Sequence, residues 1–360
     1  MIRDQGFEFR VAFASRGYAH RRWEVDLDES KFDYVILDSN SFKLKGDAER
    51  TVFTYSGIGK AIRSFGPALL IVPGFSLAST KVCFLGKVRH IPYLIWSGTI
   101  KRFGAEDSTW RVWQKKAVVR GASGAIVYGH RARQYLIDLG LPAEKVFVGV
   151  NTVDTAYYAQ CRQSSQRSAS STGPKSLLYV GHLTSGKRVD LILSAVAHLS
   201  SRRTDFVLRI VGTGSEERRL RAMVADLGIA KFVTFEGFRQ KAEVLAYLAG
   251  ANCFLFPSEY DIWGLVLNEA MAAGLPCIAS MHAGATDDLI KDGESGFVVD
   301  FNDSRRVSDL LNWILDRPDE AKRIGERASA FVSKHATIRR SASGFMRAIS
   351  QVLQPAPEGQ

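Results

Sequence analysis

The sequence predicts an α/β protein made of two doubly wound domains, each a parallel sheet covered by helices on both faces. Short runs rich in branched and aromatic residues alternate with helix-length segments along the chain. That order is typical of parallel sheets with crossover helices. A polar, Ser-rich stretch without periodicity, residues 161–176, interrupts the alternation and is the best candidate for a linker between the domains.

Strand-like runs occur on both sides of this linker. Before it they are FEFRVAFAS, YVILDS, ALLIVPG, PYLIWS and GAIVYG, and after it SLLYVG, FVLRIVG, FVTFEG, CFLFPS, PCIAS and GFVVD. Ligands of open α/β sheets bind beyond the carboxyl ends of the strands. Functional residues are therefore expected just after these runs.

Composition limits the class of protein and its partners. The chain has 360 residues, 46% of them hydrophobic, which is enough for a large core. Its longest apolar runs, such as PALLIVPGF, fall short of the roughly 20 residues that span a bilayer, and no signal-peptide pattern is seen at the N-terminus. The four cysteines form no CxxC pair or metal-ligand cluster, so a cytoplasmic protein with reduced thiols is expected.

The net charge is +11, and residues 1–160 contribute +8 of it, with 23 Lys and Arg against 15 Asp and Glu. Such a concentration favours an anionic partner for the first half of the chain. A phosphorylated ligand, a lipid surface and nucleic acid all have this chemistry.

Glycines and one lysine follow the strands of the second half. In YVGHLTSGKRVDLILSAVAHL a strand ends at Val180 and Lys187 precedes a helix. A flexible cation at a strand end suits a phosphate-bearing ligand, and a surface lysine at a helix start is the alternative. In LRIVGTGSEERRLRAM, Gly212 and Gly214 allow a tight turn after a strand, although a GxG pattern alone is weak evidence.

The stretch YDIWGLVLNEAMAAGLPCIAS, residues 260–280, places two acids on either side of a predicted helix start. Asp261 comes before the helix, which is expected to begin with Trp263, Gly264 and Leu265. Glu269 lies two turns along it. Small residues follow Glu269 and allow the helix to lie close to the sheet. Free N–H groups at such a helix start favour a phosphate or sugar oxygen, and an acid that merely stabilises the helix dipole is the alternative.

The order YVGHLTSGK, IVGTGSEE, VTFEGF, FLFPSEYDIWGLVLNEAMAAGLPCIAS and GESGFVVD resembles the C-terminal donor domain of glycosyltransferase family 4, over about residues 176–315. Members of that family are retaining, nucleotide-sugar-dependent enzymes with the GT-B fold. VFVGVNTVDTAYY and HIPYLIWS resemble its N-terminal domain more loosely. The resemblance implies an acceptor-side domain at 1–160, a donor-binding domain at 175–337, and a return helix at about 338–356 that joins the first domain.

The resemblance also assigns roles to residues. The family pattern Glu-x7-Glu corresponds to Asp261-x7-Glu269, so Asp261 is expected to bind donor-sugar hydroxyls and Glu269 the nucleotide ribose. Lys187 is expected to neutralise the donor pyrophosphate, and these three are the expected catalytic residues. The other expected donor-binding residues are Gly181, His182, Gly212, Gly237, Phe238, Trp263, Gly264, Leu265 and Gly284.

The chain departs from the family pattern in several places. Asp261 is one methylene shorter than the usual glutamate, His182 replaces an arginine, and Arg188 replaces a glycine. The family's first strand and glycine-rich loop also have no counterpart, because FEFRVAFAS looks more like the second strand. The N-terminal domain is therefore expected to lack its first strand, which is central in the common doubly wound order.

Candidates for the acceptor side are few. Many relatives have a histidine after the mid-domain strand, where LIWSGTI offers Trp96 and Ser97. His130, in VYGHRARQYL, follows a strand and begins a basic helix; a capping or surface role is its alternative. TYSGIGKAI lacks two of the residues that define a P-loop, and Asp26-Leu27-Asp28 lies far from the nucleotide motifs. No metal site and no required cofactor are expected.

The segment TIKRFGAEDSTWRVWQKKAVVRGA, residues 99–122, has a composition typical of helices that lie on membranes. Trp110 and Trp113 recur near helical spacing, with Lys115, Lys116 and Arg120 alongside. Such a helix can rest on anionic lipid. A helix with its apolar residues in the core and its basic face in water is the alternative.

These observations predict a retaining glycosyltransferase of the hexosyltransferase type, active in polysaccharide or glycolipid biosynthesis. It is expected to move a sugar from a nucleotide sugar to a saccharide acceptor, a lipid-linked one being favoured, by front-face transfer. The expected location is the cytoplasm, including the inner face of the membrane, with an anionic membrane surface and not nucleic acid as the further partner. A non-catalytic nucleotide-sugar-binding GT-B protein and a GT-B-fold sugar-nucleotide epimerase are the alternatives.

Overall fold

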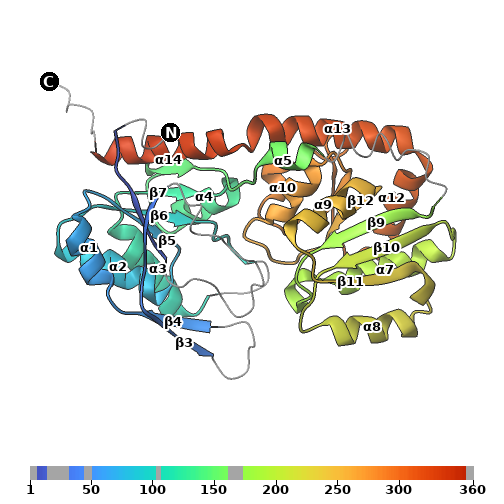
Figure 1. Cartoon of the computed structure of the whole chain (residues 1–360), viewed down its shortest axis with the longest axis horizontal. Coiled ribbons are helices and arrows are strands. Elements are labelled where there is room, and N and C mark those ends of the chain that lie inside the picture. The colour runs from blue at the N-terminus through green and yellow to red at the C-terminus, as the bar shows by residue number, and fades with distance from the viewer. Residues whose placement is uncertain (1–5, 14–31, 44–50, 103–106, 161–172, 354–360) are drawn as a thin grey trace.

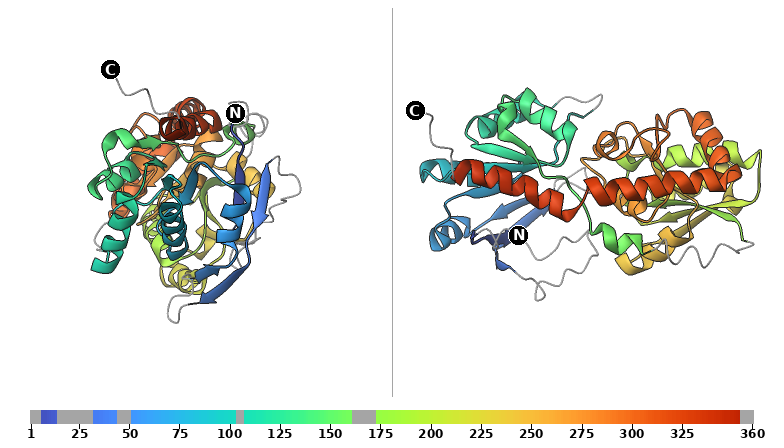
Figure 2. Two further views of the ribbon diagram at one scale, coloured as in Figure 1. Left: turned by 90° about the vertical axis from the view of Figure 1, so that its left-hand side faces the viewer. Right: turned by 90° about the horizontal axis from the view of Figure 1, so that it is seen from above.

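A computed structural model shows two α/β lobes side by side, with two long C-terminal helices running along both (Figures 1 and 2). It describes residues 6–13, 32–43, 51–102, 107–160 and 173–353. Most of the linker predicted at 161–176 and the whole Asp26-Leu27-Asp28 pattern lie outside these residues.

The first lobe is built on a parallel sheet with the strand order β5-β6-β7-β8. Each strand but the last is followed by a helix that returns the chain to the next strand, as the alternating sequence predicts. The elements are β5 (Leu70–Pro73), α2 (Leu77–Val88), β6 (Tyr93–Ser97), α3 (Thr109–Arg120), β7 (Gly124–Val127), α4 (His130–Asp138), η2 (Ala143–Lys145) and β8 (Val146–Val148). The next helix, α5 (Thr155–Ala159), already packs on the second lobe (Figure 1).

Side chains alternate between the two faces of this sheet, and each face has its own core. Tyr93 and Ile95 of β6 pack with buried residues of α2, α3 and α4. Leu94 of the same strand faces the opposite way and packs with Ala348 and Ile349 of the last helix, α14 (Ile338–Leu353). A strand buried on both faces is typical of a parallel sheet covered by helices on each side.

The N-terminal strands pair apart from this sheet. β1 (Arg10–Phe13) and β2 (Asp33–Ile36) form a parallel pair, and β3 (Ser39–Lys43) and β4 (Thr51–Tyr55) form an antiparallel pair that leads into α1 (Ile58–Phe65). Within the described part of the chain, β5 therefore lies at the edge of the four-stranded sheet. The β3–β4 pair and β8 were not among the predicted strands.

The second lobe contains a six-stranded parallel sheet with the order β11-β10-β9-β12-β13-β14, and all six predicted strands are confirmed. Its strands are β9 (Lys175–Val180), β10 (Phe206–Val211), β11 (Val233–Gly237), β12 (Cys253–Phe256), β13 (Cys277–Ser280) and β14 (Phe297–Val299). Its helical elements are η3 (Ser185–Lys187), α7 (Val189–Ser200), α8 (Glu217–Asp226), η4 (Ala230–Phe232), α9 (Lys241–Gly250), α10 (Leu265–Ala272), α11 (Thr286–Leu289), α12 (Ser304–Asp316) and α13 (Pro318–His335).

Hydrophobic cores fill both faces of this second sheet. One core joins the sheet to α7 and α12, and the other joins it to α10 and α13. Leu177 and Leu178, neighbours on β9, belong to different cores, because successive side chains of a strand point to opposite faces. This sheet thus has the doubly wound architecture predicted from the sequence.

The helices α13 and α14 join the lobes (Figure 2). α13 packs on α10 of the second lobe, and α14 packs on β7 and β8 of the first. Both crossings need glycine: a Cβ on Gly325 would lie 1.9 Å from the carbonyl oxygen of Gly274, and one on Gly344 would lie 2.1 Å from that of Val148. The last described helix, α14, therefore packs on the first lobe.

Candidate active site

The candidate site lies where the order of the second sheet reverses direction. From β9 the chain passes through α7 to β10 on one side, whereas β12 lies on the other side of β9. The helices after β9 and β12 therefore lie on opposite faces of the sheet, and in doubly wound sheets the ligand crevice lies between the carboxyl ends of two such strands. Ligands of doubly wound sheets bind at such switch points.

Two opposite charges meet at this switch point. Lys187, at the end of η3, donates through Nζ to Oδ2 of Asp261, in the segment after β12. The exposed fractions of their side chains are 27% and 13%, so the pair lies near the surface without being fully solvated. The structure thus brings together residues that are 74 positions apart and were predicted to act on the same ligand.

The carboxylate of Asp261 is held by its own segment. Its Oδ1 accepts a hydrogen bond from the backbone N–H of Trp263 at 3.2 Å, and its carbonyl oxygen accepts one from Gly284 at 2.8 Å. Gly284 approaches closely, because a Cβ there would lie 2.4 Å from the carbonyl oxygen of Ile262. The predicted glycine turn after β13 therefore supports the acid directly.

Backbone segments around the crevice are packed too tightly for side chains. A Cβ on Gly212, after β10, would lie 1.9 Å from the carbonyl oxygen of Gly181, after β9. Gly264 has a φ of +93°, and a Cβ on it would lie 2.3 Å from the ring of Phe256. Only glycine fits both positions, so the backbone itself forms the wall of the site.

The helix start at this wall differs from the prediction by two residues. α10 begins at Leu265, after Gly264, rather than at Trp263. The side chain of Trp263 is 1% exposed and donates through Nε1 to Oδ1 of Asn268 at 2.9 Å, so it belongs to the core and holds the turn in place. Leu265 and Val266 are the first residues of the helix, and their N–H groups have no acceptor within it.

Glu269 lies one turn further along α10 and is half-buried. Burial raises the pKa of this carboxyl to about 7, although a hydrogen bond from Tyr158 and the nearby charge of Lys241 lower it. A carboxyl that changes charge near neutral pH is typical of functional sites. Tyr158 lies on α5, which packs on α10, so this contact joins two helices that are far apart in the sequence.

Arg188 stands at the position where the family pattern described above has a glycine. Its φ is +50°, in the left-handed region that side chains disfavour. Burial lowers the pKa of its guanidinium, but hydrogen bonds and charges of Asp190, at 3.2 Å, and Glu259, at 3.6 Å, outweigh it and raise the pKa overall. The charge of Arg188 is thus paired with these two acids.

His182 is exposed, and its carbonyl oxygen accepts a hydrogen bond from the hydroxyl of Tyr179 at 2.9 Å. Burial, and then the negative charge of Asp261, raise the pKa of Tyr179, so its hydroxyl stays protonated and remains a donor. On the next strands, Gly237 ends β11 with a φ of +72°, and the half-buried Phe238 follows it. All four lie at the carboxyl edge of the sheet, on the side of β9, β10 and β11.

The acceptor-side candidates do not converge on one point. Trp96 packs against the ring of Phe345 on α14, with ring centroids 5.5 Å apart, and is 36% exposed. Ser97 is buried and donates to Oγ1 of Thr99 at 2.9 Å. The carboxyl end of β6 thus places Trp96 on the α14 side and Ser97 inside the loop that follows.

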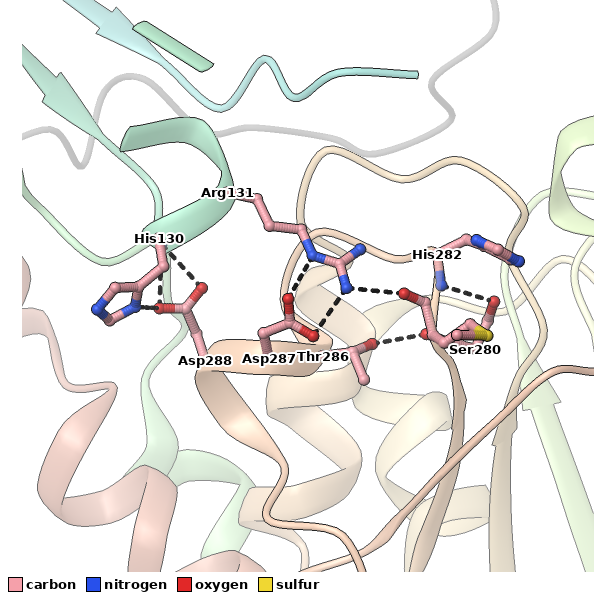
Figure 3. A network of polar contacts seen from close by, with 8 residues as sticks. His130, Arg131, Ser280, His282, Thr286, Asp287 and Asp288 are labelled. Carbon is pink, nitrogen blue, oxygen red and sulfur yellow. Dashed lines mark hydrogen bonds and ion pairs between the residues drawn. The ribbon is translucent and has the colours of Figure 1, made fainter. Parts of the chain in front are cut away.

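His130 instead contacts the second lobe (Figure 3). It begins α4, and both its ring Nδ1 and its backbone N–H contact the carboxylate of Asp288 on α11. Beside it, Arg131 binds both carboxylate oxygens of Asp287, at 2.6 and 2.7 Å, and the carbonyl oxygen of Met281 at 2.8 Å. Burial raises the pKa of Asp288, even though its contacts with His130 oppose the rise.

Contacts between positions far apart in the sequence are the part of the site that the sequence did not predict. The sequence did not identify Tyr158, Arg131 or Asp288 as residues of the site. The contact that each of these residues makes joins positions more than 100 residues apart. No spacing pattern within a short stretch of sequence can therefore predict such a contact. A cluster of acids on a short turn after a strand, here Asp287 and Asp288, is the only local sign of such a contact.

The fold and the site define a class: a protein of two Rossmann-like lobes with a switch-point crevice suited to a phosphate-bearing ligand. Residues 162–331 match the family model described as "Glycosyl transferases group 1". That range, just under half of the chain, includes Lys187, Asp261 and Glu269, so this part of the chain is similar to group 1 glycosyl transferases.

Curated relatives have names of the same kind. The chain is 32% identical over 183 residues to the putative colanic acid biosynthesis glycosyltransferase WcaL of Salmonella typhimurium, which covers 49% of this chain and 43% of that protein. It is 30% identical over 260 residues to the D-inositol 3-phosphate glycosyltransferase of Frankia alni, covering 68% and 63%. The chain thus spans less than two thirds of the length of these relatives.

Solved structures confirm the predicted fold class. A glycosyltransferase from Rickettsia africae is similar with a TM-score of 0.75 at 14% identity, over 99% of this chain and 93% of that one. HepE of Anabaena, in complex with UDP and glucose, is similar with a TM-score of 0.71 at 18% identity, over 89% and 86%. Among the residues that the structure describes, no helix has the length and apolar character needed to cross a membrane.

Proposed function

We propose that this protein is a retaining glycosyltransferase that moves a hexose from a nucleotide sugar to a saccharide acceptor carried on a lipid. In this proposal residues 175–337 bind the donor, and residues 1–160 with the return helix form the acceptor side. The product belongs to polysaccharide or glycolipid biosynthesis, the class of process named for WcaL. The enzyme acts in the cytoplasm and at the inner face of the membrane.

The contact between Lys187 and Asp261 carries the proposal. It places a cation and a carboxylate together at the switch point, where a nucleotide sugar needs one group for its pyrophosphate and another for its sugar hydroxyls. The open start of α10 supplies N–H groups beside them. Glu269, on the same helix, is the proposed partner of the ribose hydroxyls.

The proposed transfer takes place on one face of the sugar. The bond from the anomeric carbon to the phosphate oxygen breaks, and its electron pair stays on that oxygen. The acceptor hydroxyl forms the new bond on the same face and gives its proton to the departing phosphate. Lys187 stabilises the negative charge that develops on this phosphate, so the proposal requires no cofactor, and excess EDTA should leave turnover unchanged.

A panel of nucleotide sugars tests this function. Thermal shift of the purified chain with each of UDP-glucose, UDP-galactose and GDP-mannose identifies the donor, and release of the free nucleotide then measures turnover. The matching donor should raise the unfolding temperature and be consumed. Binding without consumption, with or without an added lipid-linked acceptor, would contradict an enzymatic function.

That outcome is the one expected of a second candidate, a non-catalytic protein that binds a nucleotide sugar. The same ion pair favours it, because Asp261 is already engaged by Lys187 and by the N–H of Trp263. A carboxylate held in this way has fewer free positions for sugar hydroxyls. Turnover separates the two candidates, since both predict binding.

A further inference from the structure

The helices α2 and α3 form one surface of the first lobe. They pack side by side on the same face of the sheet, where Cys83 of α2 and Val118 of α3 enter one core. A buried Gln114 joins them, because its side-chain amide donates to Oγ1 of Thr80 at 2.7 Å and to the carbonyl oxygen of Phe75 at 3.0 Å. The two helices are thus held together as a unit.

Large apolar side chains cover the outside of α2. Leu77, Phe84 and Val88 are spaced by seven and four residues, so they lie along one stripe of the helix. Their exposed fractions are 62%, 65% and 59%. Ser79, Cys83 and Gly86, the buried residues of α2, lie on the opposite side. The exposed stripe therefore takes no part in the core.

The outside of α3 carries two tryptophans. Trp110 and Trp113 are each 62% exposed, and their rings stack with centroids 5.2 Å apart. Gln114 and Val118 of the same helix face inward. The sequence allowed these tryptophans to be core residues, and the structure places them in solvent. We call the outer side of both helices, with these five apolar residues, the α2–α3 surface.

The charge of this surface has a single sign. Neither α2 nor α3 contains an aspartate or a glutamate. Exposed Lys81 and Lys87 flank the stripe on α2, and exposed Lys116 and Arg120 lie beside the tryptophans on α3. Lys115 does not contribute to this exposed charge, because its Nζ donates to Asp107 and to Tyr135 and its side chain is partly buried.

We infer that the α2–α3 surface rests on an anionic phospholipid bilayer. Tryptophan rings lie favourably at the boundary between headgroups and acyl chains, and the apolar stripe can enter that boundary while Lys and Arg attract anionic headgroups. A protein partner would need acidic groups to match the same charge, and the combination of exposed tryptophan, phenylalanine and lysine fits a bilayer better.

The position of this surface suits the proposed function, on which its purpose rests. The helix α2 begins at Leu77, just after β5 ends at Pro73 at the carboxyl edge of the first sheet, and α3 packs beside α2. At this edge the guanidinium of Arg102 lies over the ring of Tyr260, next to Asp261, at 5.5 Å. A bilayer under α2 and α3 would therefore present a lipid-linked saccharide near the cleft between the lobes.

Vesicle binding tests the inference. The full chain is sedimented with vesicles of phosphatidylcholine and phosphatidylglycerol, and with vesicles of phosphatidylcholine alone, while tryptophan emission is recorded. The parent should bind the anionic vesicles, less strongly at high salt, with a shift of emission to shorter wavelength. Phe84→Glu and Trp113→Glu should each weaken binding by about tenfold or more.

The matched control is Ile338→Glu, because Ile338 is 59% exposed and lies at the start of α14. It should bind vesicles like the parent. Equal binding by all variants would overturn the inference, as would a parent that ignores vesicles and forms a dimer that Phe84→Glu dissociates. Consumption of a soluble nucleotide sugar by the variants is measured separately. Vesicle binding without any donor consumption would support the membrane-binding role of the α2–α3 surface and would refute the proposed function.

Discussion

Glu269 is expected to make donor binding depend on pH. Its pKa is raised to about 7, so the carboxyl is protonated below neutral pH and charged above it. Ribose hydroxyls donate to a carboxylate better than to a carboxyl. Donor affinity should therefore fall by about tenfold per pH unit as the pH decreases below 7, and level off above it.

Two variants test whether the titration of Glu269 causes the pH dependence of donor affinity. Glu269→Gln should bind the donor more weakly at pH 8 and lose the dependence between pH 6 and 8. Tyr158→Phe should move the midpoint upward, because the hydrogen bond from Tyr158 lowers the pKa of Glu269. Isothermal titration with one donor at several pH values gives both results. A parent affinity that does not vary over this range would exclude Glu269 as the titrating ligand.

Asp261 should affect the chemical step more than binding. If it contacts the sugar as positive charge develops there, Asp261→Asn should lower kcat more than it weakens donor affinity. Asp261→Glu restores the family's usual residue, but the acid is only 13% exposed and already in contact with Lys187, so we expect the longer side chain to reduce activity. Steady-state kinetics with one donor measure both; equal loss in kcat and affinity for Asp261→Asn would contradict this role.

At the scale of the elements, the long parallel strands were predictable and the short irregular ones were not. Eleven apolar runs were predicted as strands, and each forms one, from β1 to β14. β8 has only three residues, and β3, whose sequence SNSFK is mostly polar, forms a local antiparallel pair with β4. Such strands depend on pairing with neighbours more than on their own composition.

In the site, too, some features could be predicted from the sequence and others could not. Lys187, Asp261 and the glycines follow strands, so their common edge could be predicted from strand order. The start of α10 was placed two residues early, because Trp263 looked like a helix residue and is in fact a core anchor for the turn. The exposure of Trp110 and Trp113 could not be predicted either, because amphipathic spacing does not show which side of a helix packs against the protein core.

Gly344 tests how the return helix is fixed. A Cβ there would lie 2.1 Å from the carbonyl oxygen of Val148, and backbone cannot move aside as a flexible side chain can. Gly344→Ala should destabilise the protein by about 1–3 kcal/mol through overpacking, despite the better helix propensity of alanine. Ser343→Ala, on the exposed neighbouring position, is the control and should change the unfolding temperature little. A more stable Gly344→Ala variant would show that α14 is not closely docked on the first lobe.

At the scale of the whole molecule, polar contacts hold the lobes in one arrangement. Arg131 of the first lobe binds Asp287 of the second through two hydrogen bonds (Figure 3). Both side chains are partly exposed, so a double-mutant cycle of Arg131→Ala and Asp287→Ala should give a coupling of about 0.5–1 kcal/mol in unfolding free energy. A coupling of zero would mean that the lobes do not keep this contact in solution.

The central claim is that the switch point between β9 and β12 binds a nucleotide sugar, with Lys187 on its pyrophosphate. The most direct test is the dissociation constant of the donor for Lys187→Ala, measured by isothermal titration beside the parent. Loss of one charge-assisted contact, about 1.5–3 kcal/mol, should weaken binding by about tenfold or more, and kcat should fall as well. Lys231→Ala, an exposed lysine before β11, should bind like the parent. An unchanged dissociation constant and kcat for Lys187→Ala, in a variant that unfolds at the parent's temperature, would contradict the account.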